Sequence, residues 1–360
     1  MEWKEYSLGD ISKLKYGKNV SAKLCKGPVP IFSGYRKIGT CNTINCKKNT
    51  VIVIARGAGG CGDVKLTKED CFLTNLSISV ELDKGICNAK WFYYNHLLNN
   101  LSFLNSGSAQ PQITIDSLSK YLIRIPPIII QRKIAGILSA LDSKIENNNK
   151  INANLEAQAE ALFKSWFVDF TPFKDQPFVD SELGPIPQGW KVGKLGDICT
   201  FKRGKNLLSK NAIDEGVPVV AGGLSPSCYH NQANTSAPVV TVSGSGANAG
   251  FMRMYHVDVW ASDCSFIDVS CDYLYFVYCF LSVNRRLLKH AQTGAVQPHV
   301  KPADIHDFDV VIPEEDIVKA FQSIIKELLT KVGVNEKENQ RLAAVRDTLL
   351  PKLMSGEIKL

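Results

Sequence analysis

The chain has 360 residues, of which 45% are hydrophobic and 21% are charged, and this balance is typical of an ordinary globular protein. Its formal net charge of +7 permits a nucleic-acid partner without requiring one. The first residues are polar or charged, and no run approaches the ~18 apolar residues that cross a bilayer, so we expect a cytoplasmic protein without membrane contact.

Residues 1–126 contain short apolar runs that are interrupted by glycine, asparagine and proline. The runs at 51–55 and 76–80 are rich in valine and isoleucine and predict strands, whereas 91–104 predicts a helix. We therefore expect a globular α+β domain over residues 1–126.

One glycine-rich segment of this domain fits a dinucleotide-binding pattern. Gly57, Gly59 and Gly62 have the G-x-G-x-x-G spacing and follow the expected strand at 51–55. The next residues show no apolar helical stripe, and the matching segment 244–250 breaks the spacing. We therefore interpret the segment as a tight glycine turn whose N–H groups could approach a phosphate, and keep nucleotide binding as a less favoured alternative.

The segment from residue 131 to residue 167 predicts a long helix. Apolar residues recur there at alternating steps of three and four, which indicates a heptad seam: Ile134, Leu138, Leu141, Ile145, Leu155, Ala159, Leu162 and Trp166. We assign 127–170 to this helix; about 36 helical residues would span roughly 54 Å, enough for a spacer. The glycines and prolines of 171–189 predict an ordered connector or a linker, and not a helix.

The chain then repeats itself 187 residues further along. The opening Trp3-Lys4 with Leu8-Gly-Asp-Ile11 recurs from Trp190, and Gly17-Lys-Asn19 recurs as Gly204-Lys-Asn206. We expect a second globular domain over 190–313, with a strand at 238–242 and a helix at 273–290, and a second long helix over 314–360. A domain-sized duplication of this kind predicts a pseudo-twofold molecule whose termini lie near each other.

Asparagines interrupt both heptad seams at matching positions, namely Asn148 and Asn152 in the first and Asn335 and Asn339 in the second. A buried asparagine at a seam costs stability but fixes register and partner choice. We therefore expect the two helices to pair with each other; the alternative is that these residues are exposed by chance. Arg346 stands where the first seam has Ala159, so either this arginine lies at the edge of the seam or the packing shifts there.

Polar and basic residues in the two globular domains, some of them at matching places, are candidates for contact with DNA. Recurrence of the lysine-rich Gly-Lys-Asn segment favours phosphate contact, and glutamine can bind adenine edges; the alternative for each group is an ordinary solvated surface. The candidates are Lys15, Lys18, Asn19, Arg56, Gln110, Gln112, Lys202, Arg203, Lys205, Arg253, Gln297 and His299.

Signatures of catalysis are missing from the sequence. It contains no P-loop, no Asn/Asp-Pro-Pro-Tyr/Phe run, no His-Glu-x-x-His and no G-x-S-x-G. Its eleven cysteines form no Cys-x-x-Cys pair, and its six histidines show no metal-like spacing. We therefore predict no catalytic residue, no metal site and no cofactor.

The chain resembles a type I restriction–modification specificity subunit over nearly all of its length. The resemblance is carried by the Trp-x4-Leu-Gly-Asp-Ile openings at Trp3 and Trp190, by Ile125-Pro-Pro followed by Gln131, by Gly184-Pro-Ile-Pro-Gln-Gly, and by the ending Leu349-Leu-Pro-Lys-Leu-Met-Ser-Gly-Glu-Ile. Each piece alone is a weak signal, but their order and duplication are specific.

This resemblance implies two target-recognition domains separated by an antiparallel coiled coil of two long helices. Each domain would recognise one half of a bipartite site in double-stranded DNA, and the helices would set the gap between the halves. It also implies two kinds of partner: methyltransferase subunits that carry S-adenosylmethionine and methylate adenine, and restriction subunits that translocate and cleave DNA. The chain itself would be non-catalytic. The alternative function is a non-catalytic coiled-coil assembly adaptor with two protein-binding domains.

Overall fold

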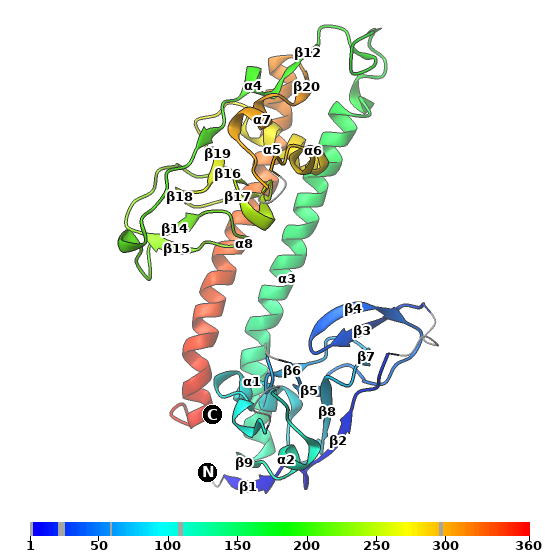
Figure 1. Cartoon of the computed structure of the whole chain (residues 1–360), viewed down its shortest axis with the longest axis vertical. Helices are drawn as coiled ribbons and strands as arrows, with labels where there is room; N and C mark the ends of the chain where they lie inside the picture. Colours follow the sequence, from blue (N-terminus) through cyan, green and yellow to red (C-terminus); the bar gives the residue numbers. More distant parts are fainter. Residues whose placement is uncertain (1–2, 21–25, 58–59, 107–110, 295–297) are drawn as a thin grey trace. The chain divides into compact units, whose positions relative to one another are not determined.

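The computed structural model describes residues 3–20, 26–57, 60–106, 111–294 and 298–360. The chain divides into two compact units, the first made of residues 1–146 with 339–360 and the second of residues 147–338 (Figure 1). The division cuts both long helices, α3 (Ile128–Phe167) and α8 (Glu315–Ser355). Each unit therefore combines a globular part with a segment of each long helix.

The first unit contains three small sheets. Strand β1 (Lys4–Ser7) pairs with β9 (Leu122–Ile125). An antiparallel sheet has the order β2 (Ser12–Tyr16), β8 (Ser77–Leu82), β5 (Val51–Ile54), β6 (Val64–Leu66). A second sheet has the order β4 (Arg36–Cys41), β3 (Val29–Ser33), β7 (Phe72–Leu73). The strands expected at 51–55 and 76–80 are thus confirmed as β5 and β8.

The helix expected at 91–104 is shorter than predicted. Helix α1 (Ala89–Leu98) begins after Asn88, whose side chain accepts hydrogen bonds from the backbone N–H groups of Lys90 and Trp91. It ends where Asn99 adopts an extended conformation, and a 3₁₀ turn follows at Ser102–Leu104. The apolar spacing continued past this point because Leu104 of the 3₁₀ turn packs against the core of the first unit, whereas Phe103 is exposed.

The core of the first unit joins the globular part to both long helices. Trp91 and Phe92 of α1 lie in one buried cluster with Ile134 and Leu138 of α3 and with Leu350 of α8. Trp3 and Leu360 pack against the same cluster, so the expected proximity of the two ends of the chain is confirmed.

A buried glutamine fixes the start of α3 to the first globular part. The side-chain amide of Gln131 donates to the carbonyls of Ile86 and Pro126, each at 2.8 Å, and its Oε1 accepts from the Asn88 N–H at 2.7 Å. Full hydrogen bonding explains how this amide is tolerated with no exposed surface. Short helix α2 (Ile115–Ser119), capped by Thr114, precedes β9.

The second unit repeats the strand order of the first. Strand β12 (Lys191–Lys194) pairs with β20 (Asp309–Ile312). The larger sheet has the order β13 (Lys202–Arg203), β19 (Cys264–Ile267), β16 (Val239–Ser243), β17 (Met252–Tyr255). The smaller sheet has the order β15 (Cys228–His230), β14 (Val217–Val220), β18 (Trp260–Ala261). The duplication expected from the sequence is therefore a duplication of fold.

The helix expected at 273–290 is interrupted by one residue. It forms α5 (Leu274–Val283) and α6 (Arg285–His290), and the two meet at Asn284. The Phe280 carbonyl accepts both from the Asn284 backbone N–H at 3.0 Å and from the Asn284 side-chain amide at 2.9 Å, so the side chain adds a second hydrogen bond at the break. Short helices α4 (Leu195–Ile198) and α7 (Pro302–His306) complete this part.

The segment after α3 forms short elements of its own and no long helix. It contains a 3₁₀ turn at Thr171–Phe173 and a hairpin of β10 (Phe178–Val179) with β11 (Ile186–Pro187). Phe167, Phe173 and Trp190 pack ring against ring, with centroid distances of 5.8 Å for Phe167–Trp190 and 5.0 Å for Phe173–Trp190. This aromatic cluster joins the end of α3 to the second globular part.

The glycine-rich segment is a turn and not a dinucleotide-binding motif. Gly57, Gly60 and Gly62 all have positive φ, and strand β6 follows them where the dinucleotide motif requires a helix. Gly59 lies outside the described residues. A Cβ on Gly62 would lie 2.3 Å from the Ser102 backbone nitrogen, so glycine is also required there by close packing.

Within each unit the two long helices run antiparallel. In the second unit Phe163 and Phe167 of α3 share a core with Phe321 and Ile325 of α8. In the first unit the earlier part of α3, with Ile134, shares a core with the later part of α8. None of the helices within the described ranges is long and apolar enough to cross a membrane.

Candidate nucleic-acid interface

The residues that follow strand β5 in the first unit and strand β16 in the second form the same backbone arrangement. We call this arrangement the strand-end frame. In the first unit Ala55 N–H donates to the Leu76 carbonyl, and the Ala55 carbonyl accepts from Ile113. In the second unit Gly244 makes the equivalent bonds to Asp263 and Val300. The next residues form bridges, Arg56 with Gln112 in one unit and Ser245 with His299 in the other.

A glycine at the edge of each frame explains the recurring Gly-Lys-Asn segment. A Cβ on Gly17 would lie 2.1 Å from the Thr74 carbonyl oxygen, and a Cβ on Gly204 would lie 2.1 Å from the Ser262 carbonyl oxygen. Any larger residue would therefore push the two neighbouring segments of the chain apart. The lysine that follows each glycine donates its backbone N–H to the adjacent segment, Lys18 to Leu73 and Lys205 to Ala261.

Around the first frame, the side chains differ in how free they are to bind a ligand. Lys18 and Asn19 are exposed. Lys15 is exposed as well, but its ammonium group forms an ion pair with Glu81 at 3.0 Å. Arg56 is half-buried, and its Nε is buried without a hydrogen-bond partner among the residues that the structure describes. Gln112 is half-buried, and its N–H donates to Asn105 Oδ1. Gln110 lies outside the described residues.

Around the second frame the polar side chains are connected to one another. Asp263 accepts hydrogen bonds from Arg203 and from Ser245 through its two carboxylate oxygens. Lys202 and Lys205 are exposed, and His299 is half-buried. Gln297 lies outside the described residues. The same backbone arrangement thus presents an arginine without a carboxylate partner in one unit and an Arg–Asp–Ser network in the other.

Arg253 is the candidate that the structure does not bring to either frame. Its guanidinium forms an ion pair with Glu336 of α8 at 3.4 Å and lies over the Tyr255 ring, 5.0 Å from its centroid. Burial raises the pKa of Glu336, while Arg253 opposes that shift. The contacts of Arg253 therefore support packing of β17 against α8.

Three of the four seam asparagines are buried, so the alternative that they are exposed by chance is wrong for them: Asn148, Asn152 and Asn335. In the second unit the Asn335 side-chain amide donates to Asn152 Oδ1 at 2.7 Å. The Asn148 amide donates to Glu338 Oε2 at 2.7 Å. Asn339 belongs to the first unit and is half-buried. Hydrogen-bonded amides therefore join α3 to α8 within the second unit.

Arg346 forms an ion pair that its sequence position alone did not reveal. Its Nη1 lies 2.7 Å from Asp142 Oδ1, and the Tyr94 hydroxyl donates to the other carboxylate oxygen at 2.6 Å. Hydrogen bonds to Asp347 and Asp142 raise the pKa of Arg346. Arg346 therefore does not disrupt the seam, because its charge is satisfied at the edge of the first unit's core.

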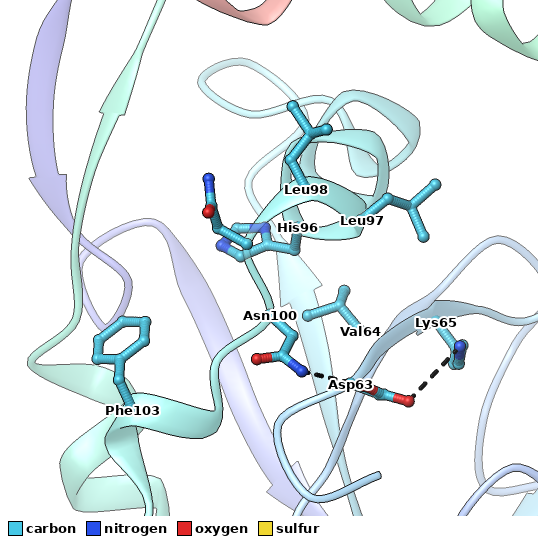
Figure 2. A pocket seen from close by; sticks show the side chains of 9 residues that line it. Asp63, Val64, Lys65, His96, Leu97, Leu98, Asn100 and Phe103 are labelled. Atoms are coloured by element: carbon cyan, nitrogen blue, oxygen red, sulfur yellow. Dashed lines mark hydrogen bonds and ion pairs between the residues drawn. The ribbon is translucent and has the colours of Figure 1, made fainter. Parts of the chain in front are cut away.

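An open hollow in the first unit shows no catalytic arrangement. Figure 2 shows Leu97, Leu98 and Phe103 around it, with Asp63 bonded to Asn100 and paired with Lys65. Burial lowers the pKa of His96 to about 4, so this histidine is neutral near pH 7. Among the described residues, no group of three or more histidine, cysteine or acidic side chains is placed to hold a metal ion.

Comparison with known proteins gives a consistent result. Residues 1–157 and 187–346 each match the type I restriction modification DNA specificity domain. The MjaIX specificity subunit of Methanocaldococcus jannaschii is 29% identical over 340 residues, covering 87% of this chain and 78% of that protein. The HindI specificity subunit of Haemophilus influenzae is 24% identical over 471 residues, covering 99% of this chain and 100% of that protein.

A solved structure shows the same fold. The crystal structure of the type I restriction-modification system S subunit from M. genitalium has a TM-score of 0.68 at 21% identity. The match covers 98% of this chain and 96% of that chain. The repeated α+β parts and the long helices are therefore features of a fold that is known from experiment.

Proposed function

Because the chain belongs to the type I restriction modification DNA specificity family, we propose that it selects the DNA sequence on which a type I complex acts. Each globular part recognises one half of a bipartite site in double-stranded DNA. The observation that carries this proposal is the strand-end frame, which occurs twice with the same backbone bonds and with different polar side chains. One frame with two sets of side chains suits two different half-sites.

The proposed domains follow the repeat. Residues 1–126 and 190–313 recognise DNA, residues 127–170 and 314–360 are the spacer helices, and residues 171–189 connect the halves. The antiparallel packing of α3 with α8 inside each unit supports a spacer of fixed length. In this proposal, the buried amides at positions 148, 152 and 335, together with Asn339, set the register of the helices.

The proposed division of labour leaves chemistry to partner subunits. Methyltransferase subunits methylate adenine, and restriction subunits translocate and cleave DNA, while this chain is non-catalytic. Its support is the lack of a recognised catalytic motif in the sequence and the specificity-subunit names of its relatives. Basic candidates outside the frames, such as Lys15 and Lys202, contact phosphates in this proposal.

The decisive experiment is genome-wide adenine-methylation mapping in cells that carry the methyltransferase subunit with and without this chain. We expect a bipartite methylated motif only when the chain is present. Binding of the complex to duplex DNA should also weaken steeply with salt, because phosphate contacts release counterions. An unchanged methylation pattern together with salt-independent or absent DNA binding would instead favour the assembly adaptor.

Two variants test the proposed division into domains. Replacing residues 1–125 with the corresponding domain of a relative should change one half-site only. Deleting seven residues from one spacer helix, which keeps the heptad seam in phase, should change the gap and leave both half-sites intact. A changed half-site after the deletion would contradict the spacer role.

A further inference from the structure

The two strand-end frames can be aligned residue by residue through their backbone hydrogen bonds. Ala55 and Gly244 make the same two bonds, so Arg56 is equivalent to Ser245 and Gln112 to His299. By the same bonds, Leu76 is equivalent to Asp263. The backbone is preserved at these positions, while Arg56, Gln112 and Leu76 are replaced by side chains of different chemical type.

Arg56 differs from several arginines of the chain in having no carboxylate partner. Arg203, Arg285 and Arg346 each form an ion pair. No ion pair or side-chain hydrogen bond joins Arg56 to another residue in the described ranges, and its buried Nε has no acceptor there. In the first unit the position equivalent to Asp263 holds Leu76, whose side chain carries no charge that could pair with Arg56. A half-buried guanidinium without an acceptor in the protein is suited to bind a hydrogen-bond acceptor on a ligand.

We infer that the bridge residues are specificity-determining positions and that Arg56 contacts a guanine in the half-site of the first globular part. This inference rests on the proposed function. Guanine presents O6 and N7 side by side in the major groove, and the planar guanidinium matches these two acceptors. Gln112, its bridge partner, lies next to Arg56 and flanks the same base pair. The second part carries Ser245 and His299 at these positions, so its half-site has no equivalent requirement.

The frame also explains why Arg56 is better placed for base recognition than the exposed lysines near it. Lys18 is on the surface and can adjust its position along a phosphate backbone. Arg56 lies two residues after the end of the buried strand β5, and its backbone is held by the bridge to Gln112. A fixed backbone limits the side-chain positions that the guanidinium can reach, which base recognition needs and phosphate contact does not.

The test maps adenine methylation for the complete chain with its methyltransferase partner. The variants are Arg56→Gln, which removes the charge and the guanidinium, and Arg56→Lys, which keeps the charge. The control is Lys84→Gln, which removes one charge from an exposed residue just after the other end of β8. Both Arg56 variants should reduce discrimination at one position of one half-site by roughly 10-fold, while the control keeps the full motif.

Other outcomes would contradict either the inference or the proposed function. If Arg56→Gln lowers methylation evenly over an unchanged motif and Arg56→Lys restores it, Arg56 contacts phosphate and the inference is wrong. An unchanged motif at an unchanged rate, or changes in both half-sites, also overturns it. If Arg56→Lys lowers the melting temperature as much as Arg56→Gln and abolishes methylation, Arg56 is structural and the inference fails. The absence of any bipartite motif with the unaltered chain would contradict the proposed function itself, and so is distinguishable.

Discussion

Where the globular part of each unit packs against the long helices, the two units use side chains of different polarity. In the first unit Asp142 of α3 pairs with Arg346 of α8 and accepts a hydrogen bond from Tyr94 of α1. The positions 187 residues away in the second unit hold Leu281, Leu329 and Ala159. All three are buried in the second core. A polar triad in one copy therefore replaces an apolar triad in the other.

This difference shows that the polar triad is not required for the helices to pack. The apolar triad supports an antiparallel helix pair in the second unit without any charge at these positions. A partly buried ion pair gains little net stability, because desolvation offsets much of the attraction. The polar triad instead makes the two helix pairs chemically distinct.

The largest expected effect is the acid sensitivity that a buried histidine gives the first unit. Buried His96 lies in the first unit, with Nδ1 2.8 Å from the Phe92 carbonyl and Nε2 3.2 Å from the Tyr121 hydroxyl. Its pKa is lowered to about 4 by burial, whereas the unfolded chain has the ordinary value of 6.5. Stability that is fully present above pH 6.5 should therefore be lost as the pH falls toward 4, by roughly 3 kcal/mol.

Hydrogen exchange of the α1 peptide at about pH 7 and about pH 4.5, corrected for intrinsic exchange rates, measures this loss. His96→Phe is the control, because it cannot titrate; its first unit should lose less stability in acid than the unaltered chain. The second unit should respond alike in both proteins, since burial and Arg253 lower the pKa of its own His256 to about 4. Equal acid sensitivity of α1 in both proteins would rule out His96 as the cause.

The polar triad itself can be converted into the apolar one. Arg346→Ala leaves the Asp142 carboxylate half-buried without its cation, and should destabilise the first unit by about 2 kcal/mol. The triple variant Tyr94→Leu, Asp142→Leu, Arg346→Ala copies the second unit and should return to within about 1 kcal/mol of the original stability. Hydrogen exchange of first-unit peptides gives both values. A triple variant less stable than Arg346→Ala would show that the two cores are not interchangeable.

The two long helices could be predicted from the sequence, whereas the polar triad could not, and the reason is physical. The heptad spacing predicted α3 and α8 because long amphipathic helices repeat one local pattern many times. The hydrogen bonds among residues 94, 142 and 346 depend on contacts between distant segments, which one sequence does not encode in a local pattern. Arg346 was visible only as an exception to the seam, and its partners were not predicted.

The strand-end frame was predicted in part. Arg56 was chosen as a DNA-binding candidate because it is basic, and Gln112 because of its residue type and repeat position, but their bridge follows from strand pairing. Arg253 was chosen because it is basic, and its ion pair with Glu336 depends on tertiary packing. Helix ends at Asn99 and Asn284 were missed because asparagine ends a helix through its side-chain and backbone geometry and leaves the apolar spacing unchanged.

A smaller effect is expected at the hydrogen-bonded amides of Asn152 and Asn335 in the second unit. Asn335→Leu leaves the Asn152 side-chain oxygen buried without its 2.7 Å donor, and should destabilise the second unit by about 1–2 kcal/mol. Adding Asn152→Leu should recover that loss, because neither polar group then remains unpaired. A double-mutant cycle read by hydrogen exchange of second-unit helix peptides measures the coupling; strictly additive effects would contradict this hydrogen bond.

The smallest effects should have opposite signs at two helical glycines. Gly136 of α3 is exposed, and a Cβ there would meet nothing within 4 Å. Gly136→Ala should stabilise the first unit by up to about 1 kcal/mol, the difference in helix propensity. At Gly333 of α8 a Cβ would lie 2.5 Å from His256 Cγ and 2.6 Å from its Cβ, so the ring and its attachment point must both move.

Gly333→Ala should therefore destabilise the second unit by about 1 kcal/mol despite the better helix propensity of alanine. Displacing the ring also reduces its burial, so the pKa of His256 should rise from about 4 toward its ordinary value. Melting curves of the two variants and an NMR titration of His256 test both statements. If both alanine variants stabilise the protein equally and the His256 pKa stays unchanged, the close contact between α8 and the second sheet is not present in solution.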